Sequence, residues 1–215
     1  MSDLGTLGGT HSIGMGINDA GDVTGAANIA GDAELHVFLY SNGTMSDLGT
    51  LGGATGQGWG INVAGQVSGT SYIAGDASRH AFFYSNGIMI DLGTLGGTES
   101  LGLGINDAGQ MVGASDIAGD VEKHAFLYSG GSLIDLNTLL PSGSAWTLSG
   151  AYDINNNRKI VGVGLINGET HAFLMTVPEP GTILLLGAGV MGMTLSRGFK
   201  RKTGTCNAAM TGSPA

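Results

Sequence analysis

Short apolar runs alternate with glycine-rich and polar turns from the N-terminus to about residue 176. The clearest example is residues 80–97, HAFFYSNGIMIDLGTLGG, where an aromatic run meets Asn-Gly and the chain returns through a second apolar run. Asn-Gly accepts positive φ at both central positions, as a two-residue type I′ turn requires. The pattern predicts a β-hairpin, which recurs at residues 36–53 and, less closely, at residues 124–140.

The hairpin belongs to a repeat of 44 residues that fills this part of the chain. Three markers recur: Asp-Leu begins at Asp3, Asp47, Asp91 and Asp135; Ile-Asn ends at Asn18, Asn62, Asn106 and Asn155; and the hairpin histidine is His36, His80, His124 or His171. The last Ile-Asn interval is 49 residues, which places five extra residues in the loop around residues 141–149. Fixed spacing with insertions confined to loops indicates stacked supersecondary units.

Each unit has the pattern of four short antiparallel strands. In the third unit these are residues 101–106, 110–115, 124–129 and 133–136. Four strands in about 44 residues, repeated, are typical of a β-propeller blade, and helical periodicity is absent. We therefore predict an all-β fold over residues 1–176, a β-propeller-like array of four four-stranded repeats.

The phase of the repeat allows two architectures. Residues 1–7 match the fourth strand of a unit, although they precede the first strand of the chain. The last unit ends after its third strand, residues 171–176. In a closed four-bladed ring these two segments would pair and remove the exposed sheet edges. The alternative is a fragment of a longer array. Met1 aligns with Met45 and Met89, and no secretory signal precedes it, which favours a reading frame that begins upstream.

The composition changes abruptly after residue 176. Two prolines, Pro178 and Pro180, cannot continue a strand because they lack ladder donors. Residues 182–195 are uncharged and mostly apolar, shorter than the about 20 residues that span a bilayer. A basic cluster follows, which would hold this end on the cytoplasmic side: Arg197, Lys200, Arg201 and Lys202. We predict a C-terminal hydrophobic helix that enters the membrane; a buried core helix is the alternative.

These three parts, with Glu179 between the prolines, resemble the PEP-CTERM sorting signal of Gram-negative bacteria. The resemblance covers residues 177–202. It implies that an exosortase, a membrane transpeptidase-like enzyme, recognises and processes the tail of an exported protein. The implied signal residues are Pro178, Glu179, Pro180, Arg197, Lys200, Arg201 and Lys202. Residues 203–215 depart from this family, whose signals usually end near the basic residues, and we expect them to be disordered.

The repeats themselves resemble a second family. His-Ala-Phe at residues 80–82, 124–126 and 171–173, with Asp-Leu-Gly-Thr-Leu-Gly-Gly, is similar to the HAF-family repeats of extracellular bacterial proteins. This resemblance covers residues 1–176 and implies a surface or matrix location with no established activity. Together the two resemblances predict a non-enzymatic exported repeat protein, anchored transiently in the inner membrane and then released to the cell surface or outside. The alternative is a module that binds exopolysaccharide.

The charge of the repeats and the single cysteine exclude one class of partner and one source of stability. Residues 1–177 hold 16 acidic and 4 basic residues, a net charge of −12, which repels phosphate backbones and argues against nucleic acid. The single cysteine, Cys206, lies outside the repeats and cannot form an internal disulfide. Burial and backbone hydrogen bonding must therefore hold the repeats together.

The repeated polar residues have structural explanations. The four histidines could suggest a metal ring, but they open the third strand, whereas the first strands line a propeller channel, so we favour packing or a hydrogen bond to a loop. The acidic turn at residues 18–22 could suggest calcium, but the second copy lacks the acid, and Asn and Asp before Gly are ordinary turn formers. For the aspartate of each Asp-Leu-Gly we predict a side-chain hydrogen bond to the following turn.

No residues stand out as catalytic. Ser12 beside His11 occurs in one unit only, and no paired carboxylates are confined to one repeat. We expect no enzyme activity, no metal and no cofactor, and hold a hydrolase or lyase as the least favoured reading. The largest departures from the repeat are Trp59 and Trp146, which are candidates for stacking on a sugar ring, with core or rim packing as the alternative.

Overall fold

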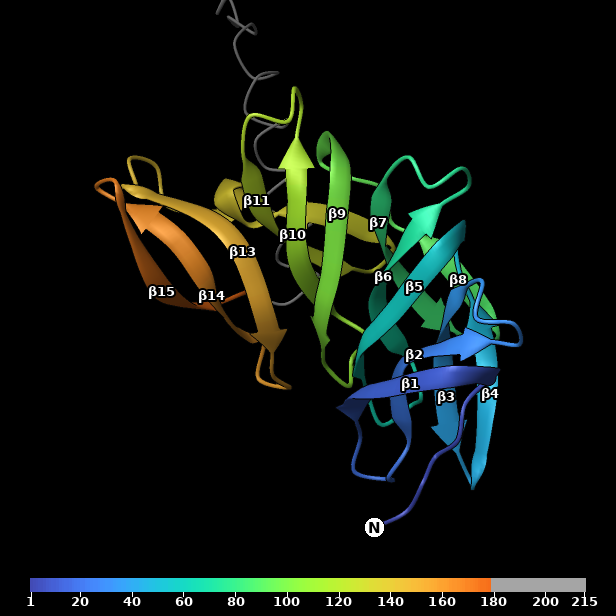
Figure 1. Ribbon diagram of the computed structural model, residues 1–215. Helices are drawn as coiled ribbons and strands as arrows, with labels where there is room; N and C mark the ends of the chain where they lie inside the picture. The colour runs from blue at the N-terminus through green and yellow to red at the C-terminus, as the bar shows by residue number, and fades with distance from the viewer. Residues whose placement is uncertain (179–215) are drawn as a thin grey trace, which may run out of the picture. The chain divides into compact units, whose positions relative to one another are not determined.

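The computed structural model describes residues 1–178, and residues 1–177 form one compact unit. The unit is built from strands in three sheets, with one short 3₁₀ helix and no α-helix among the described residues (Figure 1). The all-β prediction is confirmed. The predicted hydrophobic helix at residues 182–195, the predicted disordered tail at residues 203–215 and the signal residues from Glu179 onward lie outside the described residues.

The strands form four successive repeats. Repeat 1 is β1 (Gly8–Ile17), β2 (Val23–Ile29), β3 (Leu35–Ser41) and β4 (Thr44–Gly49). Repeat 2 is β5 (Gly52–Ile61), β6 (Val67–Ile73), β7 (Arg79–Ser85) and β8 (Ile88–Asp91). Repeat 3 is β9 (Gly96–Ile105), β10 (Met111–Ile117), β11 (Lys123–Ser129) and β12 (Ser132–Asp135), followed by the 3₁₀ helix η1 (Leu136–Leu139). Repeat 4 has three strands, β13 (Trp146–Ile154), β14 (Lys159–Ile166) and β15 (Glu169–Thr176).

Each repeat is an antiparallel meander, with every strand paired to the next. A single parallel bridge between Leu35 and Thr55 joins repeats 1 and 2 into one eight-stranded sheet. The hairpin turns have the predicted geometry: Asn42 and Gly43 have φ of 51° and 81°, and Asn86 and Gly87 have 52° and 82°. Positive φ at both positions is the type I′ signature, so this prediction is confirmed.

The aspartate of each Asp-Leu segment acts as predicted. Its side chain accepts a hydrogen bond from the backbone N–H two residues on, for example from Gly49 to Asp47 Oδ1 at 2.7 Å. The same bond forms at Asp3, Asp91 and Asp135. The first strands are longer than predicted: β9 begins at Gly96 rather than residue 101, because the Gly-Gly pair enters the strand directly. Gly96 has φ of 107°, which a residue with a Cβ rarely adopts.

The apolar core lies between the repeats. One cluster joins Val37 of repeat 1 to Val67 and Phe82 of repeat 2, and another joins Ala81 of repeat 2 to repeat 3. The third and largest cluster joins repeats 3 and 4. A repeat therefore buries its apolar face only by packing on its neighbour, as expected for a repeat architecture.

An asparagine ladder connects the repeats in the same order. Asn18 Nδ2 donates to the carbonyl of Asn62 at 2.9 Å, Asn62 Nδ2 to Asn106 at 3.0 Å, and Asn106 Nδ2 to Asn155 at 3.2 Å. The Oδ1 atom of each Asn also accepts the backbone N–H groups of its own turn. These asparagines are the Ile-Asn markers of the sequence. Asn18, Asn62 and Asn106 each stabilise the turn of their own repeat through Oδ1 and bind the next repeat through Nδ2.

The repeats form an open fan within this unit (Figure 1). The first strands β1, β5, β9 and β13 converge at their C-terminal ends, and repeats 1 and 4 lie at the two ends of the fan. The predicted closing pair is not formed: residues 1–6 lie outside strands, and β15 pairs with β14 alone among the described strands. Leu7 instead bridges Ile29, and Ser12 Oγ donates to the carbonyl of Gly5, so repeat 1 holds this segment itself.

Candidate functional site

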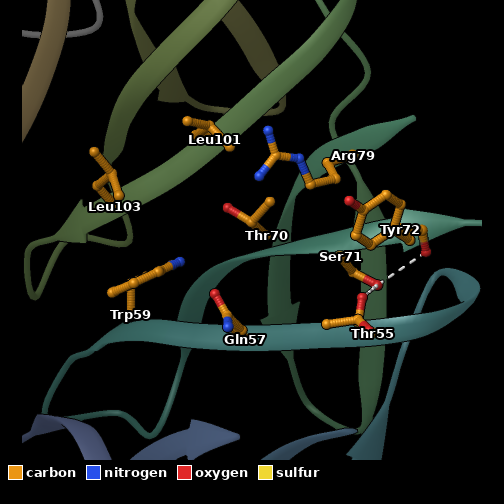
Figure 2. Close-up of a pocket in the computed structure, with 9 residues that line it drawn as sticks. All are labelled: Thr55, Gln57, Trp59, Thr70, Ser71, Tyr72, Arg79, Leu101 and Leu103. Atoms are coloured by element: carbon orange, nitrogen blue, oxygen red, sulfur yellow. Dashed lines mark hydrogen bonds between the residues drawn. The ribbon is translucent and has the colours of Figure 1, made fainter. Parts of the chain in front are cut away.

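A pocket of about 220 Å³ lies between repeats 2 and 3 (Figure 2). The side chains of Thr55, Gln57 and Trp59 point into it from alternate positions of β5, as the two-residue period of a strand requires. The remaining lining residues come from β6, β7 and β9: Thr70, Ser71, Tyr72, Arg79, Leu101 and Leu103. The pocket therefore combines two aromatic rings, an amide, a guanidinium and several hydroxyl groups with the apolar side chains of Leu101 and Leu103.

The pocket gathers positions at which repeat 2 differs from its copies. The corresponding residues of repeats 1 and 3 are Ile13 and Leu101 for Gln57, Met15 and Leu103 for Trp59, Asn28 and Asp116 for Tyr72, and Leu35 and Lys123 for Arg79. The framework residues of the hairpin are retained in all three repeats. Because these four substituted positions lie together in the pocket, they indicate a site that is particular to repeat 2. Sequence reasoning found Trp59 alone; comparing the strands position by position would have found the others.

Arg79 forms the charged rim of the pocket. Its Nη2 lies 3.0 Å from Glu99 Oε2, its Nε lies 3.3 Å from Glu99 Oε1, and its guanidinium carbon lies 5.9 Å from the centre of the Tyr72 ring. The bond to Glu99 raises the pKa of Arg79 above its ordinary value, against a smaller opposing effect of burial. Glu99 belongs to β9, so this pair bridges repeats 2 and 3 and fixes the guanidinium over the aromatic ring.

Thr70 places an unpartnered hydroxyl in the pocket. The residue is 7% exposed, and its Oγ1 has no hydrogen-bond partner among the described residues. Figure 2 shows this side chain among those of Gln57, Leu101 and Arg79. A buried polar atom without a partner is costly, so it indicates a position that a ligand group or ordered water completes.

A second, larger cavity of about 470 Å³ lies where the four first strands converge. Ile17, Trp59, Leu103 and Tyr152 line it, one from each repeat. All four first strands thus contribute to the lining of this cavity, although the described repeats do not close into a ring around it. Trp59 lines both cavities, so it stands at the boundary between the inter-repeat pocket and this space.

Trp146 lies elsewhere. It packs on the core between repeats 3 and 4, and its ring meets that of His171 edge to face with centres 6.3 Å apart. It lines a different cavity, beside the loop at residues 140–144. The two tryptophans that the sequence singled out therefore do not share a pocket, because the five-residue insertion moves Trp146 to the start of β13 rather than its middle.

The histidines of the first three repeats pair with the recurring Asp-Leu aspartates of their own hairpins rather than with each other. The distances from Nδ1 to the carboxylate are 2.9 Å for His36–Asp47, 2.9 Å for His80–Asp91 and 2.7 Å for His124–Asp135. His171 has no such aspartate and lies 3.5 Å from Glu169. Among the described residues no group of three or more His, Cys, Asp or Glu side chains is arranged to hold a metal. These pairs clamp the third strand of a repeat to its fourth.

We expect these pairs to make stability depend on pH. Partial burial lowers the pKa of His124, but Asp135 and Glu122 outweigh it and raise the pKa above its ordinary value. Burial also lowers the pKa of His36, and Glu34 and Asp47 outweigh it in the same way. A raised pKa in the folded state stabilises the fold below the ordinary pKa, and this contribution is lost as pH rises through the raised value. Unfolding free energy from urea titrations should therefore fall as pH rises above about 6.5. The fall should be smaller in His124→Gln and in Asp135→Asn; an unchanged slope in both would contradict this role.

The comparison with known families concerns the other end of the chain. Residues 176–202 match the PEP-CTERM protein-sorting motif. The PEP-CTERM motif is the recognition signal of exosortase and implies export with a transient membrane-anchored sorting step, so an exosortase is the implied partner. Of its residues the structure describes only those to Pro178, which is separated from the end of β15 by Val177. Among the described residues no helix has the length and apolar character needed to cross a membrane. No curated protein matches the chain, and the resemblance to HAF repeats stays a prediction.

Proposed function

We propose that this chain is a non-enzymatic repeat protein of the Gram-negative cell surface or extracellular matrix, exported and sorted through its PEP-CTERM tail. The PEP-CTERM match at residues 176–202 is the observation that carries the proposal. The HAF-like repeats would form a propeller-like scaffold, for which the converging first strands are the structural support. The repeated polar residues in the described part of the chain serve turns and clamps, which supports a role without catalysis.

The test is the fate of the full chain in a bacterium that has an exosortase. Expressed behind an export leader, the chain should reach the cell surface in shortened form. In a strain without the exosortase it should stay full-length in the inner membrane. Replacing Pro178, Glu179 and Pro180 together by alanine should reproduce that retention, whereas the control Pro141→Ala should not. Surface delivery of the wild type in the exosortase-free strain, or of the triple variant in the strain that has exosortase, would refute sorting through the tail.

A second function is supported by the inter-repeat pocket: binding of a neutral polysaccharide. Trp59 and Tyr72 offer aromatic faces for the C–H face of a sugar ring, while Gln57, Thr70 and Arg79 offer hydrogen bonds around it. At about 220 Å³ the pocket suits one ring of a longer chain. The neutral class is favoured because Glu99 already neutralises Arg79 and residues 1–177 carry a net charge of −12.

Two substitutions test this pocket. Trp59→Ala should weaken binding to the best ligand on a neutral glycan array about tenfold, corresponding to about 1.4 kcal/mol. Thr70→Val should also weaken binding while leaving the fold at least as stable, because it removes a hydroxyl that the described fold leaves unpaired. Trp146→Ala is the matched control and should bind normally. Absence of binding to any neutral glycan would rule out this second function without affecting the proposed sorting.

A further inference from the structure

The three inter-repeat interfaces use the same positions each time. On the side that faces the next repeat, one position is Thr24, Ser68 or Val112, and all three are fully buried. A second is Val37, Ala81 or Ala125, again fully buried. A third is Leu39, Phe83 or Leu127. The next repeat covers each of these sets.

Repeat 4 has the same face, and none of the repeats among residues 1–178 packs on it. The corresponding residues are Val161, Ala172 and Leu174. Val161 is 44% exposed, Leu174 is 67% exposed, and Ala172 is also exposed. Positions that a following repeat covers in the first three repeats are therefore uncovered in repeat 4 among the described residues, and there they carry apolar side chains on the neighbouring strands β14 and β15.

Repeat 1 has the complementary face open. Ile17 is 72% exposed, whereas the corresponding Ile61 and Ile154 are buried against the preceding repeat at 8% and 3%. Val23 is half-buried where Val67, Met111 and Ile160 are fully buried. The ladder is also interrupted here: no preceding asparagine donates to the carbonyl of Asn18 among the described residues, and Asn155 Nδ2 has no acceptor there.

We propose that a second copy of this chain covers these faces, with repeat 4 of one copy docked on repeat 1 of the next. The interface would continue the three already present in each chain: Leu174 and Val161 would pack beside Ile17 and Val23 of the neighbour. Asn155 Nδ2 would donate to the neighbour's Asn18 carbonyl, as Asn106 does to Asn155. The contact is head-to-tail, so it leads to a ring if the rotation closes and to a filament if it does not.

Charge favours this orientation over contacts between like faces. Residues 1–49 contain six acidic residues and no lysine or arginine, so two copies of repeat 1 would repel each other. Residues 146–177 contain two acidic and two basic residues, Asp153, Glu169, Arg158 and Lys159, which leaves repeat 4 near neutral. Repeat 1 therefore meets less repulsion from repeat 4 than from itself, and the apolar faces match only in the head-to-tail arrangement.

The test measures the mass of the full chain by light scattering in non-ionic detergent over a range of micromolar concentrations. The wild type should exceed the mass of one chain, and Leu174→Glu and Ile17→Glu should each return it to one chain. The control Ile88→Glu, exposed on β8 away from both faces, should keep the wild-type mass. Mixing the two variants one to one should give pairs only, because each retains one intact face.

Several outcomes would overturn the proposal. A wild type with the mass of one chain at every concentration would show that the faces are closed within the chain or covered by residues beyond 178. Leu174→Glu and Ile17→Glu variants that keep the wild-type mass would place the contact elsewhere. A mixture that stays at one chain would refute the head-to-tail arrangement even if both single variants dissociate.

Discussion

Replacing Gly113 by alanine should strongly destabilise the repeat unit. A Cβ at Gly113 would collide with the carbonyl oxygen of Leu101 on the paired strand β9 and would lie 2.7 Å from Phe126 Cζ. The Leu101 carbonyl is held in the sheet and the Phe126 ring is fully buried, so neither can move aside cheaply. We expect a loss of about 3 kcal/mol in the free energy of unfolding, measured by urea titration.

Gly150→Ala is the matched control for this substitution. It also lies in a strand, but the nearest atoms to its Cβ would be 3.8 Å away, an ordinary contact distance. Its cost should be a small fraction of that at Gly113. Equal stability of the two variants would mean that the close packing of ring on glycine does not hold the repeat together. Gly25, Gly69 and Gly162 occupy the corresponding positions, each beneath the phenylalanine of its own repeat.

The sequence predicted features that are local and repeated. The hairpins follow from Asn-Gly between apolar runs, and the hydrogen bond from Gly49 to Asp47 follows from turn chemistry, because each depends on a few consecutive residues. The glycine beneath each phenylalanine was not predicted, although a glycine that recurs inside a strand can indicate a close approach. A period of 44 residues could also be recognised as stacked sheets before any contact was known.

The remaining features depend on contacts between repeats. The pocket takes Gln57 and Trp59 from one repeat and Leu103 from the next, so no single stretch contains its pattern. The second role of each Ile-Asn asparagine was hidden for the same reason, because Asn near Gly already has an explanation as a turn former. Whether the array closes depends on the rotation between neighbours, which side-chain size sets at each interface and which the repeat length does not encode.

The second large effect is expected at the buried rung of the asparagine ladder. Asn106 is 3% exposed; its Oδ1 accepts from the backbone N–H groups of Ala108 and Gln110, and its Nδ2 donates to Gln110 and to the carbonyl of Asn155. In Asn106→Ala the N–H groups of Ala108 and Gln110 and the carbonyl of Asn155 would each lose the hydrogen bond that the Asn106 side chain provides. At about 1–3 kcal/mol for each buried group left unpaired, Asn106→Ala should cost about 3 kcal/mol.

Asn155→Ala separates the turn from the contact between repeats. Asn155 makes the same turn bonds, to the N–H groups of Asn157 and Lys159 at 3.0 Å, but it is exposed and has no acceptor for Nδ2 among the described residues. Water can replace its bonds, so the cost in dilute protein should be about 1 kcal/mol. Equal losses at the two positions would assign the whole effect to the turn. If copies dock head-to-tail, the cost of Asn155→Ala should rise with protein concentration while that of Asn106→Ala stays constant, because only the Asn155 bond then depends on a neighbour.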